Sequence, residues 1–225
     1  YVAKAEAAKT AASISAATAE EWAKQAKTIA GGNFAPDGYG LGTEPAFVED
    51  LNDAVVNGWY KAIGDATKNY PALIAGLGGA YGVLFVQTRG VYKYQELRHK
   101  NDIALRYYDG STWSEWEYVN PPMNAGVEYR TTERYLGKPV YAKLFNAGTF
   151  PASGSKSVDH GISDIKDIVS AIGNLGDVAS LPYIYGSTRQ EFLVNKSAVL
   201  MTSVTPAYTN ANAMITIRYT KTTDT

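Results

Sequence analysis

Residues 58–122 read GWYKAIGDATKNYPALIAGLGGAYGVLFVQTRGVYKYQELRHKNDIALRYYDGSTWSEWEYVNPP. The aromatic and β-branched residues form short alternating runs separated by Gly, Asn and Asp, the pattern of hairpins with one packed face. We predict strands from the runs at 59–60, 84–86, 91–94, 105–107 and 113–118. The stretch contains no pattern typical of a catalytic centre. It therefore predicts a compact β-rich module that serves for display or for contact.

The composition describes a folded chain without a strong electrostatic preference. Its 225 residues are 45% apolar and 12% aromatic, which is ample for a packed core. Twenty-one Lys and Arg residues against 22 Asp and Glu residues give a net charge of −1. We therefore expect no nucleic-acid partner and no anionic membrane partner.

Two absences in the sequence narrow the function classes further. The chain has no cysteine, which excludes disulfide scaffolds, thiolate metal sites and thiol catalysis. No apolar run approaches the roughly 20 residues of a membrane helix, so membrane insertion is not expected. Because the chain begins at Tyr1 without a methionine, we expect it to be the C-terminal part of a longer protein.

The first 30 residues predict one long helix. Residues 2–30 are rich in Ala, contain no Gly or Pro, and are followed by the stop signal Gly31-Gly32. A heptad seam of small residues can be traced through Val2, Ala5, Lys9, Ala12, Ala16, Ala19, Ala23, Ala26 and Ala30. Burying Ala stabilises a helix little, so this helix gains most from bundling with its own copies. A self-associating stalk over residues 1–32 is our interpretation, and a lone flexible helix is the alternative.

The remaining chain divides into a connector and two β-rich parts. Five glycines and two prolines between residues 31 and 45 predict a connector, which we assign to residues 33–53. The central module is assigned to residues 54–122, where Pro121-Pro122 ends it, and a C-terminal β-sandwich to residues 123–225. Within that sandwich we predict strands at 127–130, 138–145, 183–185, 191–194, 198–204 and 213–219. The exception is a helix predicted over 162–172, from the spacing of Ile162, Ile165, Ile168, Val169 and Ile172.

The search for chemistry gives no catalytic residue. His99 lies in a charged run that predicts a solvated turn. His160 has Asp159 beside it and Ser163 three residues on, but adjacent residues do not form a triad, and a capping or turn role is our interpretation. Gly76-Leu-Gly-Gly79 lacks the ending of a phosphate-binding loop and predicts a plain loop. We accordingly expect no enzyme activity, no cofactor and no metal.

The aromatic residues allow two interpretations. As a platform they would stack on the apolar faces of sugars, and as ordinary strand residues they would fill the core. For the central module we favour the core, for Trp59, Tyr60, Tyr92, Tyr94, Tyr107, Tyr108, Trp113 and Trp116. Loops on a rigid scaffold carry recognition more often. The candidate ligand contacts are therefore in the C-terminal part: Tyr183, Tyr185, Arg189, Tyr208, Asn210 and Asn212.

The central module resembles a known family in the order of its motifs. Gly58-Trp59-Tyr60, Asn69-Tyr70-Pro71, Gly82-Val83-Leu84-Phe85-Val86, Gln95, Leu105-Arg106-Tyr107-Tyr108 and Trp113-Ser114-Glu115-Trp116 resemble the pyocin knob domain of tail fibres. The flanking motifs are similar to tail-tip receptor-binding proteins of phages and prophages: Gly38-Tyr-Gly-Leu-Gly42, Pro121-Pro-Met123, 126–133, 137–141 and 218–224.

The resemblance implies a mainly β protein with a β-rich knob, a β-sandwich head and an N-terminal trimeric coiled-coil stalk. It implies a homotrimeric tail fibre that attaches, without catalysis, to a bacterial surface polysaccharide. The protein would lie at the extracellular distal tip of a virion tail and join other tail or baseplate proteins through a part that precedes Tyr1. The alternatives are a glycan-degrading, tailspike-like depolymerase and a structural fibre spacer. No sugar-contact motif of the family can be matched to residues of this chain.

Overall fold

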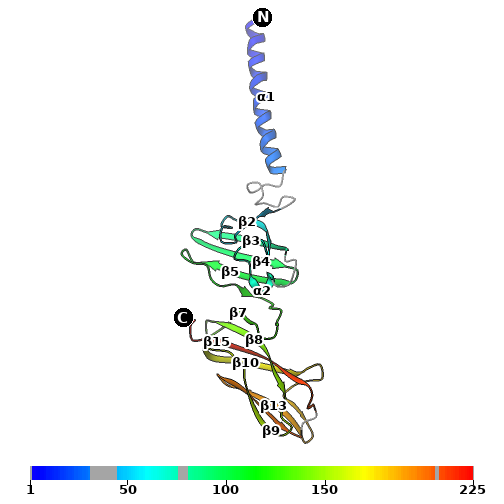
Figure 1. Cartoon of the computed structure of the whole chain (residues 1–225). Coiled ribbons are helices and arrows are strands. Elements are labelled where there is room, and N and C mark those ends of the chain that lie inside the picture. Colours follow the sequence, from blue (N-terminus) through cyan, green and yellow to red (C-terminus); the bar gives the residue numbers. More distant parts are fainter. Residues whose placement is uncertain (1, 31–44, 76–80, 206–207, 225) are drawn as a thin grey trace. The chain divides into compact units, whose positions relative to one another are not determined.

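A computed structural model of the chain describes residues 2–30, 45–75, 81–205 and 208–224. The protein is mainly β, as predicted, and it divides into two compact units. Unit 1 comprises residues 1–100 and 106–114, and unit 2 comprises residues 101–105 and 115–225 (Figure 1). The predicted domain limits after residues 32, 53 and 122 stay predictions. Most of the predicted connector and the glycine loop at 76–79 lie outside the described residues.

The helix predicted over residues 2–30 is present as α1 (Val2–Ala30). Ala, Lys and Glu dominate it, and their high helix propensity favours a helical backbone. Thr10 and Thr18 each donate a hydrogen bond from their Oγ1 to the carbonyl oxygen four residues earlier. Every side chain of α1 that the structure describes is exposed, including Ile14 and Trp22. The coiled-coil seam stays a prediction.

Unit 1 is built on a twisted antiparallel sheet that follows the chain order. Its strands are β1 (Ala46–Phe47), β2 (Gly58–Ile63), β3 (Tyr81–Arg89) and β4 (Tyr92–His99), followed by the end of β5 (Asp102–Tyr108). The short β1 pairs with β2 in parallel, and β3 pairs with both β2 and β4 antiparallel. A single turn of helix, α2 (Ala72–Ala75), lies between β2 and β3. The predicted strand runs at 59–60, 84–86, 91–94 and 105–107 are confirmed.

One face of this sheet forms the core of unit 1. Alternate residues of the strands are buried there, for example Leu84, Val86 and Leu97, and they are covered by Leu51 and Ile74, which are fully buried. A polar side chain joins these layers, since Gln95 Nε2 donates to the carbonyls of Leu51 and Ala54 at 2.6 and 3.0 Å. Its Oε1 accepts from Arg106 Nε at 2.8 Å. The buried amide of Gln95 therefore has its hydrogen bonds satisfied, which a buried polar group requires.

Unit 2 is a sandwich of two sheets that share one apolar core (Figure 1). The first sheet runs β6 (Glu117–Tyr118), β7 (Glu128–Tyr135), β8 (Lys138–Thr149), β15 (Asn212–Lys221), β10 (Ile165–Leu175) and β11 (Ala179–Leu181). The second runs β12 (Tyr183–Tyr185), β13 (Thr188–Val194), β14 (Ala198–Val204) and β9 (Gly154–Asp159). The core between them includes Phe145, Leu175, Met201, Ile215 and Ile217. All six strands predicted for this part of the chain are confirmed.

The helix predicted over residues 162–172 is wrong, because Ile165–Leu175 form strand β10. Its pairing with β15 is interrupted by register shifts between Ile165 and Ile168 and between Ile168 and Ser170. Such bulges break the alternation of a strand, so that its apolar residues acquire spacings that imitate a helix. The β-branched Ile and Val residues favour the strand in any case. Asp164, just before β10, has a φ of 61°, which a helix does not allow.

The strand predicted over residues 113–118 is confirmed only in part. Trp113 forms an isolated bridge with Tyr108 in unit 1, and only Glu117–Tyr118 form a strand, β6, in unit 2. Ser114 bonds to Tyr107 twice, since its backbone N–H donates to the Tyr107 carbonyl at 2.8 Å and its Oγ accepts from the Tyr107 N–H at 3.1 Å. Within the described part of the chain, no helix has the length and apolar character that crossing a bilayer requires.

Candidate functional site

The outer face of the unit 1 sheet exposes the aromatic residues that were expected in its core. Of the eight aromatic residues assigned to the core, Tyr60 alone is buried. Tyr92, Tyr94 and Tyr107 are exposed, and the other four are partly buried: Trp59, Tyr108, Trp113 and Trp116. The reason is alternation: in β3 and β4 residues such as Leu84, Gln95 and Leu97 point inward, so the aromatic residues that alternate with them point outward. The core interpretation is therefore wrong for Tyr92, Tyr94 and Tyr107 and confirmed for Tyr60, while the four partly buried residues contribute to both sides.

A shallow depression of about 480 Å³ lies on unit 1 where β2, β3 and β4 meet. Its lining includes Asn57, Phe85, Gln87, Thr88, Arg89 and Tyr94. Gln87 and Tyr94 are directly opposite each other in the β3–β4 pairing, and Arg89 ends β3. The Phe85 ring packs on the Trp59 ring with centroids 4.6 Å apart. The size is within the range of small-ligand sites, and the lining combines ring faces with polar groups.

One side of this depression is fixed by hydrogen bonds. Asn57 Oδ1 accepts from both the backbone N–H and the Oγ1 of Thr88, at 2.5 and 2.9 Å. Among the described residues, the side chains of Gln87, Arg89 and Tyr94 have no such partner. The depression therefore has a rigid wall at Asn57 and Thr88, and it leaves an amide, a guanidinium and a phenol to bind other molecules.

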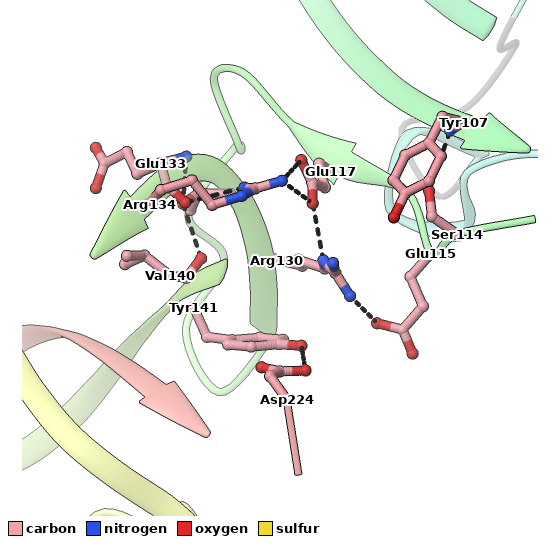
Figure 2. Close-up of polar contacts among 11 residues, drawn as sticks. Tyr107, Ser114, Glu115, Glu117, Arg130, Glu133, Arg134, Val140, Tyr141 and Asp224 are labelled. Atoms are coloured by element: carbon pink, nitrogen blue, oxygen red, sulfur yellow. Dashed lines mark hydrogen bonds and ion pairs between the residues drawn. The ribbon is translucent and has the colours of Figure 1, made fainter. Parts of the chain in front are cut away.

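A second cluster, in unit 2, joins acidic residues of the segment 115–117 to arginines of β7 (Figure 2). Glu117 is almost fully buried and accepts from Arg130 Nε at 3.0 Å and from Arg134 Nη2 at 2.7 and 2.8 Å. Glu115 pairs with the other end of Arg130 at 3.6 Å. Burial lowers the pKa of Arg130, but Tyr141, Glu117 and Glu115 together raise it by more, so that its pKa is raised.

The same part of unit 2 contains two tyrosines bound to carboxylates. Tyr141 Oη donates to Asp224 Oδ1 at 3.2 Å, and burial raises the pKa of Tyr141 to about 12. The Lys221 ammonium lies 4.3 Å from the centroid of the Tyr141 ring. Tyr219 and Lys221 both donate to Glu128. These contacts join the ends of β7, β8 and β15.

This cluster suits the joining of strands better than acid–base catalysis. A general acid for glycoside cleavage must carry a proton that it can release. The Glu117 carboxylate instead accepts three hydrogen bonds from Arg130 and Arg134, and Glu115 pairs with Arg130, so both carboxylates are occupied in joining the segment 115–117 to β7. Within the described residues, no group of three or more Asp, Glu or His side chains is placed to hold a metal ion.

The two histidines are buried structural residues. His99 lies in β4 rather than in the predicted solvated turn, and its Nδ1 contacts the Tyr81 carbonyl oxygen at 3.1 Å. The turn role predicted for His160 is confirmed, since its Nδ1 accepts from the Ile162 N–H at 3.1 Å and its Nε2 contacts the Asn195 carbonyl oxygen at 3.1 Å. There is no helix there for His160 to cap.

The structure brings together part of the predicted set of ligand contacts in unit 2. The rings of Tyr183 and Tyr208 pack edge to face with centroids 5.1 Å apart, and the Tyr208 hydroxyl raises the pKa of Tyr183. The buried Gln190 holds the Tyr208 backbone through two hydrogen bonds of 3.3 Å. Tyr185 follows on β12 and is 77% exposed.

The other predicted contacts lie apart from this pair. Arg189 pairs with Glu191 at 2.7 Å. It precedes the inward-facing Gln190 on β13 and therefore lies on the opposite face of the sheet. Asn210 is exposed, and Asn212 begins β15, where its carbonyl accepts from the Gly176 N–H at 3.0 Å.

Four aliphatic side chains are exposed on the outer face of the four-stranded sheet. Leu193 and Leu200 are directly opposite each other on β13 and β14, and Ile184 and Val204 lie on either side of Arg189, separated from the leucines by the Glu191–Thr202 pair. All four side chains are exposed, Leu193 by 66%. We call them the aliphatic face. The alternation of residues in β13 and β14 separates two faces, but because both faces carry apolar side chains, it does not show which of them is the core.

No protein family and no curated protein matches the sequence. Among solved structures, an N-truncated R2-type pyocin tail fibre matches at 12% identity with a TM-score of 0.28, over 76% of this chain and 94% of that chain. The R1 pyocin fibre of P. aeruginosa matches at 13% identity with a TM-score of 0.27, over 77% of this chain and 66% of that chain. TM-scores this low do not establish a common fold.

Proposed function

We propose that the chain belongs to a tail fibre of a phage or phage-like particle, and that it attaches to a bacterial surface saccharide as a homotrimer without catalysis. The observation that carries the proposal is the exposure of aromatic and aliphatic side chains on the outer sheet faces of both units. Exposed apolar surfaces of this kind mark sites of contact with other molecules. The order of motifs shared with pyocin knob domains supports the particular class.

The helix α1 supports the homotrimer. No described side chain of this 29-residue helix is buried, and an isolated helix of this kind is marginal in water. Packing against copies of itself would bury its apolar side chains. The aliphatic face offers a second surface for contact between copies. Three linked copies would also raise the apparent affinity of weak saccharide sites without any new contact.

The saccharide contacts of the head are proposed at Tyr183 and Tyr208. Both rings are partly buried against the core of unit 2, and their edge-to-face packing and the clamp from Gln190 fix the parts of them that remain accessible. A rigid aromatic group stacks on a pyranose with little loss of conformational entropy. Tyr185, which follows Tyr183 on β12 and is exposed, would contribute to the same contact. Arg189, on the opposite face of the sheet, would not, and roles for Asn210 and Asn212 stay predictions from the sequence.

Binding of the fluorescently labelled full chain to a panel of purified bacterial surface polysaccharides tests this function. We expect saturable binding to at least one polysaccharide and about a tenfold loss in the variant Tyr208→Ala. Tyr135→Ala, which replaces an exposed tyrosine elsewhere in unit 2, is the matched control and should bind normally. Binding of no polysaccharide would favour the spacer, and the release of new reducing ends would favour the depolymerase.

A further inference from the structure

We infer that the depression on unit 1 is a separate binding site for an acidic saccharide, in which Phe85 and Tyr94 contact the sugar ring and Arg89 binds its carboxylate. This inference rests on the proposed function in one respect, that the chain binds saccharides. It differs in location, because the proposed head contacts all lie in unit 2.

The ring faces at the depression suit a pyranose. Tyr94 is 53% exposed on β4, and Phe85, in the next strand, is held by its contact with Trp59. Both side chains come from neighbouring strands of one sheet, so their positions are fixed by the pairing of β3 with β4. Fixed aromatic side chains offer apolar area to the C–H groups of a sugar at a low entropic cost.

The polar groups at the depression suit hydroxyl groups. Gln87 lies between Phe85 and Arg89 on the same face of β3, and it is exposed. Its amide both donates and accepts hydrogen bonds, as sugar hydroxyls do. Asn57 is locked by Thr88 through its Oδ1, which leaves its amide N–H groups to donate. A site formed in advance by protein hydrogen bonds loses less freedom when a ligand binds.

The charge at the depression indicates an anionic ligand. Arg89 is the charged residue of the lining, and no acidic residue contributes to it within the described part of the chain. Arg98, on the same face of the sheet, differs from Arg89 because its guanidinium already pairs with the carboxylate of Glu96 at 2.5 Å. A guanidinium binds a carboxylate through two parallel hydrogen bonds. The combination of a ring, hydroxyl groups and a carboxylate describes a uronic acid.

A second copy of the chain is a weaker occupant for this site. A two-fold contact would bring Arg89 of one copy towards Arg89 of the other, because it uses the same patch twice, whereas the heterologous contacts of the proposed homotrimer join two different patches and do not require this face. The concave form and the exposed amide of Gln87 also suit a small polar ligand better than a flat protein surface.

Paired methyl glycosides test the inference on the intact chain. Methyl glucuronide, methyl galacturonide and methyl mannuronide each differ from the corresponding neutral hexoside only by a carboxylate in place of a hydroxymethyl group. Saturation-transfer NMR should show binding of at least one uronide with an affinity of about 1 mM, and binding at least fivefold weaker for its neutral partner. Hydrogen exchange should show protection of the peptides that contain residues 57–58 and 85–94.

Two pairs of variants locate the site. Arg89→Met should weaken uronide binding about tenfold, whereas Arg98→Met removes the same charge from the same face and should leave it unchanged. Tyr94→Ala should also weaken binding, and Tyr107→Ala, at a similarly exposed tyrosine, should not. Circular dichroism checks that each variant is folded. If Tyr94→Ala unfolds, the comparison of Arg89→Met with Arg98→Met still tests the inference, because Arg89 is exposed and its replacement should not affect folding.

Four results would overturn the inference. The first is equal affinity for a uronide and its neutral partner, and the second is an equal loss of uronide affinity in Arg89→Met and Arg98→Met. The third is the absence of binding of any uronide at 50 mM. The fourth is protection of residues 85–94 from hydrogen exchange that increases with protein concentration in the absence of sugar. The last would identify a second copy as the occupant. Failure of the proposed function is a different result, since it is read from intact polysaccharides and from the Tyr208→Ala variant in unit 2.

Discussion

At the scale of single residues, Gly82 shows how closely the inner face of unit 1 is packed. A Cβ at this position would lie 2.5 Å from the Tyr70 hydroxyl and 3.3 Å from a Leu97 methyl group. Tyr70 is itself buried, and its hydroxyl has no hydrogen-bond partner in the described structure. There is therefore no room for an added methyl group between Gly82 and Tyr70. The glycine is required by this close approach, since Gly82 lies within strand β3.

We predict that Gly82→Ala destabilises unit 1 by about 1–3 kcal/mol, the usual cost of overpacking a core. The double variant Gly82→Ala, Tyr70→Phe should recover part of that loss, because it removes the oxygen that the new Cβ would approach. Urea unfolding of the three proteins measures both effects. An unchanged free energy of unfolding in Gly82→Ala would contradict the close approach.

The Tyr70 hydroxyl also predicts a pH dependence. Burial raises the pKa of Tyr70 to about 12 from the ordinary 10. The folded state therefore holds this proton more tightly than the unfolded state does. Its contribution to stability is complete below pH 10 and is lost as the pH rises towards 12. Urea unfolding of unit 1 between pH 8 and 11.5 should show this decline, and Tyr70→Phe should show less of it.

The buried carboxylate of Glu117 and the exposed carboxylate of Glu115 should differ in how much they contribute to the stability of unit 2. We predict that Glu117→Gln destabilises unit 2 by about 2–4 kcal/mol, because it leaves Arg130 and Arg134 without their partly buried anionic partner. Glu115→Gln removes a carboxylate that is 73% exposed and should cost less than about 0.5 kcal/mol. Thermal unfolding of both variants is the measurement, and equal losses would contradict the difference in burial.

At the scale of elements, the aliphatic face is the part of the four-stranded sheet that copies of the chain would cover. We predict that Leu193→Asp leaves the chain folded and weakens its self-association, since Leu193 is exposed in one copy. Ile172→Asp introduces the same charge at a similarly exposed position of β10 and is the control. Analytical ultracentrifugation compares the two masses. Retention of the full assembly by Leu193→Asp would exclude this face from the contact.

The accuracy of the sequence predictions differed among elements for physical reasons. Strand β14 was predicted at its true bounds, because its buried and exposed residues alternate without interruption from Ala198 to Val204. Strand β10 was missed because two bulges break that alternation. Strand β9, Gly-Ser-Lys-Ser-Val-Asp, carries almost no apolar signal, and its place depends on pairing with β14.

The candidate sites were harder to predict than the strands. Sequence alternation shows that Tyr94 and Gln95 point to opposite faces, but it does not show which face is covered. Here the buried amide of Gln95 faces the core and the aromatic ring faces outward, the reverse of what hydrophobicity suggests. The Tyr183–Tyr208 pair was chosen from the sequence, yet its contact depends on the distant Gln190. The depression at Asn57 and Arg89 had no sequence signal at all.

At the scale of the whole molecule, the proposed trimer has a simple physical signature. Three chains of 24.3 kDa give a particle of about 73 kDa. We predict this mass for the full chain, and a shift towards the monomer at low micromolar concentration when residues 1–30 are removed. Light scattering at several concentrations measures both. A full chain that stays monomeric at 50 μM would contradict the trimer and the gain in avidity that depends on it.

The two faces of the unit 1 sheet also differ in how freely evolution can change them. Folding depends on the inner residues, such as Leu84, Leu97 and Gln95, which are buried and joined to the rest of the unit. The outer positions around Gln87 and Tyr94 contribute little to folding, so substitutions there are seldom removed for loss of stability. Selection can therefore alter the outer face while the scaffold stays the same. A library varied at positions 83, 87, 89, 92 and 94 would consist largely of folded proteins with different surfaces.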